Sequence, residues 1–300
     1  MAGMEVSLEG KVAIVTGAGP NIGSGIALAL ARYGAKVACN DLDPAAAQAS
    51  VDRITRHGHD AFAIPGDVTD EDAVRGYVDE VVQRYGRLDI VINNAAILGG
   101  RPMLLESLEF FNRAIEVAAA GTFLNSKYGA IAMIEREIKG SIVNILSSNA
   151  WQGAPGVCAY AFHKGGMANF TRACAMELAP YGIRVNSYSP TAPRPDNPEM
   201  LRAGRSFVAP DRGGERPAWW KDYGKIDVRG AMPMMPSTPT DIGHCVAWVV
   251  SDYARLITGC DFVIDGGARA KYWAYTPPEE KAEPIPLVPL YEDETMEGGF

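Results

Sequence analysis

The feature that most constrains this chain is a regular alternation of short apolar runs with longer amphipathic stretches. Near-continuous β-branched runs are typical of strands that are buried on both faces of a sheet. The apolar runs cover residues 11–16, 36–40, 61–64, 88–92, 141–146, 183–188 and 261–264, and helical patterns cover 22–33, 44–57, 70–85, 107–136, 157–178 and 240–252. Because such alternation produces right-handed βαβ units, the sequence predicts an α/β fold with a doubly wound, seven-stranded parallel sheet.

Two segments interrupt this alternation. Residues 191–238 contain seven prolines and six arginines without a strong period, and a long loop inside a compact domain is usually functional. Residues 271–300 contain five prolines and seven acidic residues, a composition too rich in proline for a regular element. We therefore expect a single catalytic domain over 1–270, with 191–238 as a substrate lid, followed by an acidic tail over 271–300.

Charge and composition exclude several classes of function. The 300 residues carry 28 basic and 36 acidic side chains, a net charge of −8, and the tail contributes −5 of it. Nucleic acids and anionic membranes bind surfaces rich in Lys and Arg, so we expect neither as a partner. No uncharged apolar run approaches the ~20 residues that a membrane span needs.

Cysteine and histidine spacing gives no sign of a disulfide framework or a metal site. The five cysteines are Cys39, Cys158, Cys174, Cys245 and Cys260, an odd number without a C-x-x-C pair. This pattern suits a reduced, cytoplasmic protein, and the histidines show no ligand spacing, so we expect no catalytic metal.

The first predicted strand ends in a glycine-rich loop, Thr16-Gly-Ala-Gly-Pro-Asn-Ile-Gly-Ser-Gly25, which leads into a helix. Glycines let the backbone approach a pyrophosphate, whose charge is met by the N–H groups at the start of the helix. The alternative is an ordinary glycine turn of an α/β protein. The loop is therefore a candidate dinucleotide site, and Gly17, Asn21, Ile22 and Gly23 are its candidate contacts.

Asp41 lies at the end of the second predicted strand, eighteen residues after Gly23. A carboxylate at this place can hold the adenine ribose hydroxyls of NAD and would repel the 2′-phosphate of NADP. No Arg or Lys lies in 18–24 or at positions 40 and 42 to receive that phosphate. Asp41 therefore favours NAD as the cofactor, and the alternative is that Asp41 caps the helix that begins at Pro44.

From about residue 8 to 267, the chain resembles the short-chain dehydrogenase/reductase family. Beyond the loop at Thr16, its motifs occur in the order Asp67-Val68, Asn93-Asn94-Ala95, Ser147, Tyr160-x-x-x-Lys164, Pro190 and Asp265-Gly266-Gly267. The resemblance implies a Rossmann-type fold with an NAD site. By resemblance, Asp67 and Val68 contact the adenine, Asn93 lies beside the ribose, and Ala95, Tyr160, Lys164 and Pro190 also belong to the cofactor site.

The resemblance also implies a catalytic group formed by Ser147, Tyr160 and Lys164. Tyr160 and Lys164 are four residues apart, so a helix places them on one face. A phenol is a poor base at neutral pH, but a nearby ammonium and a positive nicotinamide ring favour its phenolate. Tyr160 would then exchange a proton with the substrate hydroxyl, and Ser147 would hydrogen-bond the substrate oxygen.

Four positions depart from the family pattern, and the smallest departure is Ala96, which replaces a Gly at the end of the motif after the fourth strand. Asn21 replaces a loop glycine, and Asn tolerates left-handed backbone geometry better than most residues. Ala118 stands where the family has an Asn in its proton relay, so water or another side chain, such as Ser148, would have to serve. Pro193 has no N–H for the nicotinamide carboxamide.

Aromatic residues near these motifs are candidates for the substrate wall. Trp151 follows Ser147 by four residues, and Trp219 and Trp220 lie in the predicted lid. They would suit a bulky hydrophobic alcohol or ketone, unless they only pack the lid onto its own domain.

The sequence thus predicts an NAD(H)-dependent oxidoreductase that interconverts a secondary alcohol and a ketone. The alternatives are a non-catalytic NAD-binding protein of the same fold, which Ala118 and Pro193 suggest, and an enoyl or carbonyl reductase. By resemblance, the helices over 107–136 and 157–178 would pair copies of the chain into a homodimer or homotetramer.

Overall fold

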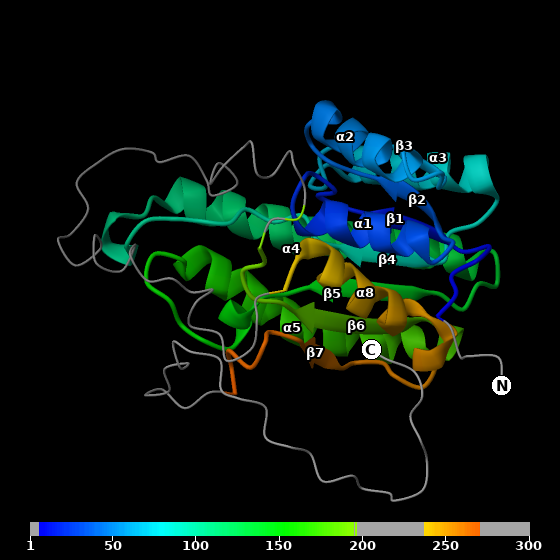
Figure 1. The fold of residues 1–300 in the computed structure, drawn as a ribbon. Helices are drawn as coiled ribbons and strands as arrows, with labels where there is room; N and C mark the ends of the chain where they lie inside the picture. The colour runs from blue at the N-terminus through cyan, green and yellow to red at the C-terminus, as the bar shows by residue number, and fades with distance from the viewer. Residues whose placement is uncertain (1–5, 195, 197–236, 271–300) are drawn as a thin grey trace, which may run out of the picture.

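The computed structural model of the protein describes residues 6–194, 196 and 237–270 (Figure 1). In this part of the chain, seven parallel strands form one sheet in the order β3-β2-β1-β4-β5-β6-β7. The strands are β1 (Val12–Val15), β2 (Lys36–Cys39), β3 (Ala61–Ala63), β4 (Ile90–Asn93), β5 (Ser141–Ile145), β6 (Arg184–Ser189) and β7 (Asp261–Val263). All seven lie within two residues of the predicted bounds, and the predicted doubly wound sheet is confirmed.

The helices also lie close to their predicted positions. They are α1 (Ile22–Arg32), α2 (Pro44–Thr55), α3 (Glu71–Tyr85), α4 (Leu108–Ile134), α5 (Cys158–Leu178) and α8 (Pro239–Val250). Short 3-10 helices cover Met103–Leu105, Ser148–Ala150, Ala179–Tyr181 and Asp252–Ala254. The side chains of Asp43, Asp70 and Ser107 cap α2, α3 and α4, so local sequence sets where these helices begin.

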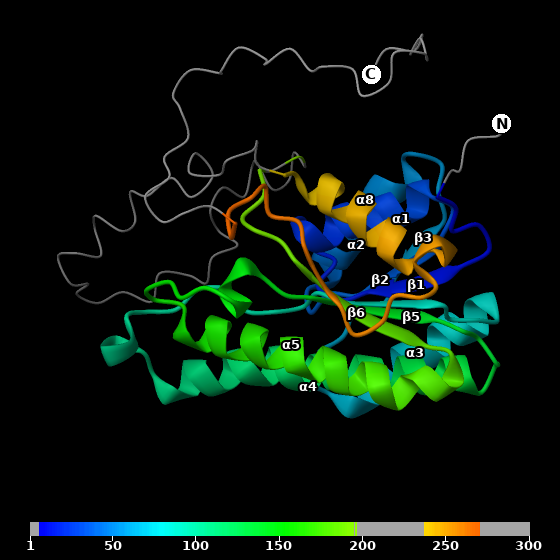
Figure 2. The ribbon, with the colours of Figure 1, turned by 90° about the horizontal axis from the view of Figure 1, so that it is seen from below.

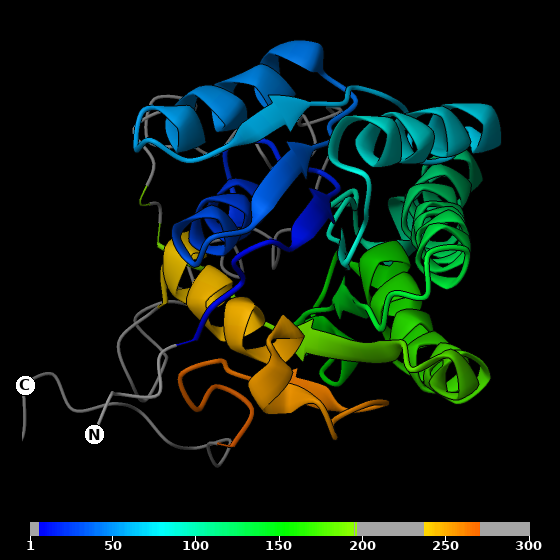
Figure 3. The ribbon, with the colours of Figure 1, turned by 90° about the vertical axis from the view of Figure 1, so that its right-hand side faces the viewer.

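The helices cover the sheet in two layers (Figures 2 and 3). Helices α1, α2 and α8 lie on one face, and α3, α4 and α5 lie on the other. Side chains of β1 alternate between these faces: Ala13 and Val15 join the core below α1 and α8, and Val12 and Ile14 join the core below α3 and α4. Both faces of the central strands are therefore buried, as their continuous β-branched runs predict.

The strand order creates one switch point, between β1 and β4. From β1 the chain builds outward through β2 and β3, then returns to the other side of β1 and continues through β4 to β7. Loops that leave β1 and β4 therefore turn to opposite faces and leave a crevice at the carboxyl ends of these strands, where α/β proteins bind ligands. We therefore expect the predicted cofactor site at this crevice.

The two ends of the predicted lid meet beside α8. The N–H of Arg194 donates to the carbonyl of Ser237 at 2.8 Å, and the carboxylate of Asp196 accepts from the N–H of Thr240 at 2.9 Å. Asp196 also pairs with Arg53 of α2, at 3.5 Å between Nη2 and Oδ1. The remainder of the predicted lid, 197–236, and the predicted tail, 271–300, lie outside the described residues.

Candidate active site

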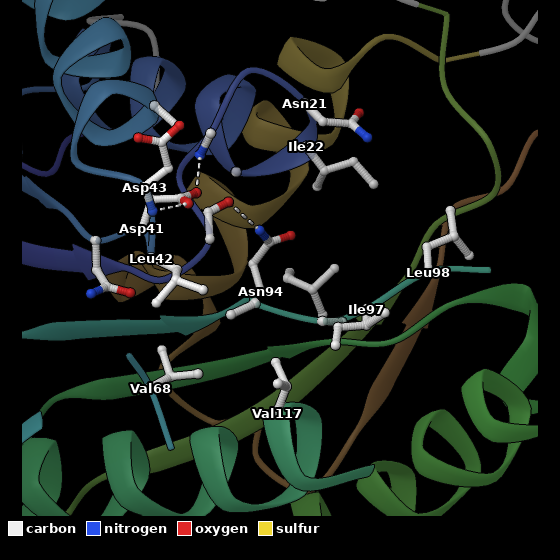
Figure 4. A pocket seen from close by; sticks show the side chains of 18 of the residues that line it. Asn21, Ile22, Asp41, Leu42, Asp43, Val68, Asn94, Ile97, Leu98 and Val117 are labelled. Atoms are coloured by element: carbon white, nitrogen blue, oxygen red, sulfur yellow. Dashed lines mark hydrogen bonds between the residues drawn. The ribbon is translucent and has the colours of Figure 1, made fainter. Parts of the chain in front are cut away.

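A cavity of about 550 Å³ opens at the switch point (Figure 4). Ten of the twelve residues predicted to bind the cofactor line it: Gly17, Asn21, Ile22, Gly23, Asp41, Asp67, Val68, Ala95, Tyr160 and Lys164. They come from the carboxyl ends of four neighbouring strands, β1 to β4, and from the first two turns of α1 and α5. The fold thus brings together positions that are spread over almost 150 residues of the sequence.

The glycine-rich loop forms one wall, and two of its glycines are required by geometry. Gly17 has a φ of +58°, which residues with a Cβ rarely adopt. A Cβ on Gly23 would stand 2.0 Å from the carbonyl oxygen of Gly17, so α1 can begin this close to the loop only with glycine there. This cradle fits a dinucleotide, whose pyrophosphate needs close approach of the backbone.

The start of α1 is suited to an anion. Within the described residues, no side chain caps this helix, and its first turn contains no acidic residue. The positive end of the helix dipole and its first N–H groups therefore remain for a ligand. Asn21 does not use the left-handed backbone that Asn tolerates, because its φ is −114°.

Asp41 points into the cavity and is held by the backbone. Its Oδ2 accepts from the N–H of Gly19 at 2.9 Å, and its Oδ1 accepts from the N–H of Asp43 at 3.1 Å. Burial raises the pKa of Asp41, while these backbone hydrogen bonds lower it and the charge of Asp43 raises it further. Asp43, rather than Asp41, caps α2 by accepting from the N–H of Ala45 at 2.9 Å, so Asp41 is not needed as a helix cap.

Hydrogen bonds from Asn94 connect the loop after β4 to the loop after β1. Its Nδ2 donates to the carbonyl of Gly17 at 2.8 Å and to that of Thr16 at 3.1 Å. In turn, the hydroxyl of Thr16 accepts from the N–H of Ala95 at 3.2 Å. Sequence reasoning missed Asn94, although the doubled asparagine after the fourth strand was a possible signal.

Asn93, which was expected beside the ribose, does not line the cavity. Its side chain is buried, and its Nδ2 donates to Asn144 Oδ1 at 2.8 Å and to Ser126 Oγ at 3.0 Å. Side chains alternate between the faces of a strand, so the last residue of β4 points into the layer of α4 and the next residue faces the loop of β1. Pro190 does not line the cavity either; its carbonyl accepts from the N–H of Ser148 at 3.0 Å.

The part of the cavity near Asp67 combines apolar walls with a polar edge. Leu42 projects from one side, and Val68 and Val117 project from the other (Figure 4). Leu42 is 66% exposed, so its side chain is open to a ligand in the cavity. Leu42, Val117 and Arg113 also line this region, and none of them was predicted as a site residue.

The three predicted catalytic residues come together at the start of α5. Tyr160 and Lys164 lie on one face of this helix, with the Lys164 ammonium 5.6 Å from the centre of the phenol ring. Ser147 follows β5, and its hydroxyl lies close enough to the phenol of Tyr160 to lower the pKa of that phenol. Lys164 is buried and donates to the carbonyl of Ile145. A substrate oxygen beside Tyr160 would therefore meet two hydroxyl groups and, behind them, a buried amine.

Burial has a larger effect on these groups than the sequence analysis expected. It raises the pKa of Tyr160, and the hydrogen bond from Ser147 only partly opposes that shift. Burial also lowers the pKa of Lys164 to about 7. Because removal from water disfavours a phenolate and an ammonium alike, the expected stabilisation of the Tyr160 phenolate by Lys164 does not dominate in this structure.

His163 lies between the two catalytic residues in sequence and packs against Tyr160 in space. The two rings meet edge to face, with centroids 5.0 Å apart. Among the described residues, neither ring nitrogen has a well-aligned hydrogen-bond partner, although the main chain of Ile97 slightly favours the imidazolium. Burial first, and the charge of Lys164 second, lower the pKa of His163 to about 3. The imidazole is therefore neutral, and it packs against Tyr160 as an uncharged ring.

Ala118 lies in a small apolar cluster with Leu146, Met167 and Ala168, and it is fully buried. Its methyl group supplies no hydrogen-bonding group where the family has its relay Asn.

Trp151, a predicted substrate residue, does not line the cavity. Its Nε1 donates to Ser189 Oγ at 3.2 Å, and the guanidinium of Arg269 lies 5.0 Å from its ring centre. Trp219 and Trp220 lie outside the described residues.

Two further observations bear on chemistry and environment. In the described part of the chain, no three His, Cys, Asp or Glu side chains gather as metal ligands. None of the helices described is both long and apolar enough to cross a membrane.

Comparisons with known proteins agree with the geometry of the cavity. The model of the short chain dehydrogenase family matches residues 11–205. The chain is 34% identical over 264 residues to a cyclopentanol dehydrogenase of Comamonas sp., covering 87% of this chain and 97% of that protein. It is 33% identical over 273 residues to an uncharacterized oxidoreductase of Thermotoga maritima, covering 88% and 98%. A crystal structure of a short-chain type dehydrogenase/reductase from Mycobacterium marinum matches with a TM-score of 0.75 at 30% identity, covering 89% and 98%.

Proposed function

The chain belongs to the short-chain dehydrogenase family, and from this premise we propose that it is an NAD(H)-dependent oxidoreductase that interconverts a secondary alcohol and a ketone. The observation that carries the proposal is the convergence of Ser147, Tyr160 and Lys164 beside a cavity whose other walls fit a dinucleotide. A single cavity can then bring a hydride carrier and a proton-transfer group to the same substrate carbon and oxygen.

A bound nicotinamide dinucleotide would supply the hydride acceptor or donor. The chain's own residues would handle the proton and the oxygen. Tyr160 would take the proton of the alcohol hydroxyl or return it to the ketone oxygen. Ser147 would hydrogen-bond that oxygen where negative charge develops, and Lys164 would hold a positive charge near the phenol.

Asp41 supports NAD rather than NADP. Its carboxylate faces the cavity, and Asp43 adds a second carboxylate to the same wall. Of the residues that line the described cavity, the two cations are Arg113 and Lys164; the first is paired with Asp67 and Glu116, and the second belongs to the catalytic group. Among these lining residues, a 2′-phosphate would therefore meet negative charge and no available cation.

The substrate that we propose is hydrophobic. Ile97 and Leu98 of the loop after β4 give the cavity an apolar border, and Leu98 is 40% exposed. The name of the cyclopentanol dehydrogenase indicates that a relative acts on an apolar secondary alcohol. Both observations favour an alcohol or ketone with a bulky apolar body over a highly polar one.

The direct test is a panel of apolar secondary alcohols and ketones, assayed with NAD⁺ or NADH by absorbance of the reduced nicotinamide. We expect turnover with at least one substrate, and a loss of at least ~100-fold in kcat for Tyr160→Phe with NADH binding retained, because Phe removes only the transferable proton. Tyr181→Phe, which changes an exposed tyrosine, is the control.

The rival proposal is a non-catalytic NAD-binding protein, and the inert methyl group of Ala118 is the observation that favours it. NADH binding without turnover of any substrate in the panel would support this rival and contradict the proposed activity.

The pH dependence of alcohol oxidation tests the role of Ser147. Tyr160 must lose its proton to act as a base, and burial raises its pKa, so kcat/KM should rise with pH. Because the Ser147 hydrogen bond lowers this pKa, Ser147→Ala should move the profile to higher pH. A profile that Ser147→Ala lowers uniformly, without moving it, would contradict this role.

We also propose that the protein works in the cytoplasm as a homo-oligomer. All five cysteines are unpaired, which suits a reducing compartment. Helices α4 and α5 present exposed apolar side chains, among them Phe123 and Phe162, that a second copy of the chain could cover.

A further inference from the structure

Arg113 connects α4 to the loop after β3 at the wall of the cavity. Its Nη2 donates to Asp67 Oδ2 at 2.9 Å, and its Nη1 donates to Glu116 Oε2 at 2.8 Å and to Thr69 Oγ1 at 3.3 Å. Arg113 and Asp67 both line the cavity, with side chains 40% and 32% exposed. The pair therefore borders the space that a ligand would occupy.

The hydrogen bonds of Asp67 leave one acceptor position open. Oδ1 accepts from the N–H of Thr69 at 2.9 Å and from its hydroxyl at 2.8 Å. With Arg113 on Oδ2, three of the roughly four acceptor positions of a carboxylate are filled. The fourth belongs to Oδ2, and a ligand must offer an N–H or O–H donor to use it.

Arg113 also helps to lower the pKa of this carboxyl group. Burial alone would raise the pKa of Asp67, but the hydrogen bonds from Thr69 and Arg113 and the positive charge of Arg113 outweigh it, so that the pKa is lowered. An ionised carboxylate accepts hydrogen bonds and cannot donate one. A ligand that presents a lone pair to Asp67 is therefore repelled.

The surroundings of Asp67 fit a flat heterocycle. Leu42 lies on one side of the space, Val68 and Val117 lie on the other (Figure 4), and the carboxylate and guanidinium stand at its edge. Apolar walls cover the faces of a base, and the polar edge can distinguish one base from another through its exocyclic group.

We propose that Arg113 is a positioning residue that sets the base preference of the dinucleotide site, since by fixing Asp67 it selects a 6-aminopurine over a 6-oxopurine. The inference rests on the proposed binding of a nicotinamide dinucleotide. The 6-amino group of adenine donates an N–H to the open position on Oδ2. The 6-oxo group of hypoxanthine places a lone pair against the same carboxylate, and the site rejects it.

The test compares the binding of NADH with that of its hypoxanthine analogue, by fluorescence titration of the full chain. For the unaltered protein we expect the analogue to bind about tenfold more weakly or worse, the range for one charge-assisted hydrogen bond. Arg113→Met keeps the apolar stem but removes the hydrogen bond that holds Asp67 Oδ2. In this variant, the ratio of the affinities for NADH and for the analogue should fall below about threefold, mainly because NADH binds more weakly.

Two further variants make the test specific. Arg113→Lys keeps the charge without the forked geometry, and we expect intermediate discrimination. Arg75→Met removes a comparable exposed pair, in which Arg75 Nη2 lies 2.7 Å from Asp72 Oδ1 on α3; its discrimination should equal that of the unaltered protein. Circular dichroism checks that each variant folds.

Three outcomes would overturn the inference. If Arg113→Met keeps the original discrimination, or weakens both dinucleotides equally, Arg113 does not set base preference, while the proposed function stands. If the unaltered protein binds both dinucleotides equally, the open position on Asp67 does not read the base. If it binds neither dinucleotide, the proposed function fails together with the inference.

Discussion

At the scale of single residues, two carboxylates border the cavity and are held in different ways. Asp41 accepts only backbone N–H groups, and burial raises its pKa. Asp67 accepts from Thr69 and Arg113, and its pKa is lowered. Among the described residues, no cation pairs with the first carboxylate, which suits hydroxyl donors such as those of a ribose. The second is neutralised by Arg113 and suits a weaker, directional donor.

Asp41 should control the choice between NAD and NADP. In Asp41→Ser we expect the preference for NAD⁺ over NADP⁺, measured as a ratio of kcat/KM values, to fall by about 10- to 100-fold, or ~1–3 kcal/mol. The control is Asp43→Ser, which removes the neighbouring carboxylate but keeps a residue that can cap α2. Equal effects of the two substitutions would contradict a specific role for Asp41.

His163 should make the fold sensitive to acid. Its pKa is about 3 in the folded protein, because of burial and of Lys164, against about 6.5 when unfolded. The unfolded chain therefore binds an extra proton between these values, and the free energy of unfolding should fall as pH drops from about 6.5 toward 3, by at most ~1.4 kcal/mol per pH unit.

Urea titrations at a series of pH values measure this slope. His163→Phe keeps a ring against Tyr160 without a titrating group, so the slope in this window should decrease. His57→Gln, which changes an exposed imidazole, is the control. An unchanged slope in His163→Phe would mean that other groups cause the acid sensitivity.

At the scale of elements, close contact between α1 and α8 depends on glycine in both helices, Gly25 in α1 and Gly243 in α8. A Cβ on Gly25 would lie 2.3 Å from the backbone carbon of Pro239, and neither helix can yield easily at that point. The predicted glycine-rich loop thus continues into a helix-packing contact, which positions the start of α1 at the cavity. Sequence periodicity indicated both helices but not their approach at Gly25.

Gly25→Ala should lower the free energy of unfolding by about 1–3 kcal/mol, because the two helices must separate. Gly76→Ala is the matched control: Gly76 also lies within a helix, α3, but its Cβ would meet nothing within 4 Å. There alanine should raise the stability by about 0.5–1 kcal/mol. Urea unfolding measures both, and equal effects of the two substitutions would contradict the packing argument.

At the scale of the whole molecule, α4 and α5 lie side by side on the outer layer of the sheet (Figure 2). Phe123 on α4 is 50% exposed, and Phe162 and Met176 on α5 are 63% and 64% exposed. Large apolar side chains at this exposure favour association through these helices.

Light scattering on a sizing column tests the proposed oligomer. We expect a mass of two or four times the 32.1 kDa of one chain, and Phe123→Asp should reduce it, because a buried interface does not accept an unpaired charge. Leu256→Asp, at an 88% exposed position outside both helices, is the control. A mass of one chain, or an effect equal to that of the control, would contradict the proposal.

The sequence by itself determined the strands, the helices and the order of motifs along them, because these depend on local periodicity, capping and glycine. The sequence also predicted that Asp41, Tyr160 and Lys164 meet at one cavity, because parallel strands all present their carboxyl ends at the same edge of the sheet. Only the tertiary structure decided that Asn94 rather than Asn93 meets the loop of β1, and that Trp151 bonds Ser189 and does not line the cavity. It also decided that Arg113 holds Asp67, 46 residues away. These outcomes depend on side-chain direction and on contacts between distant segments, which no local pattern encodes.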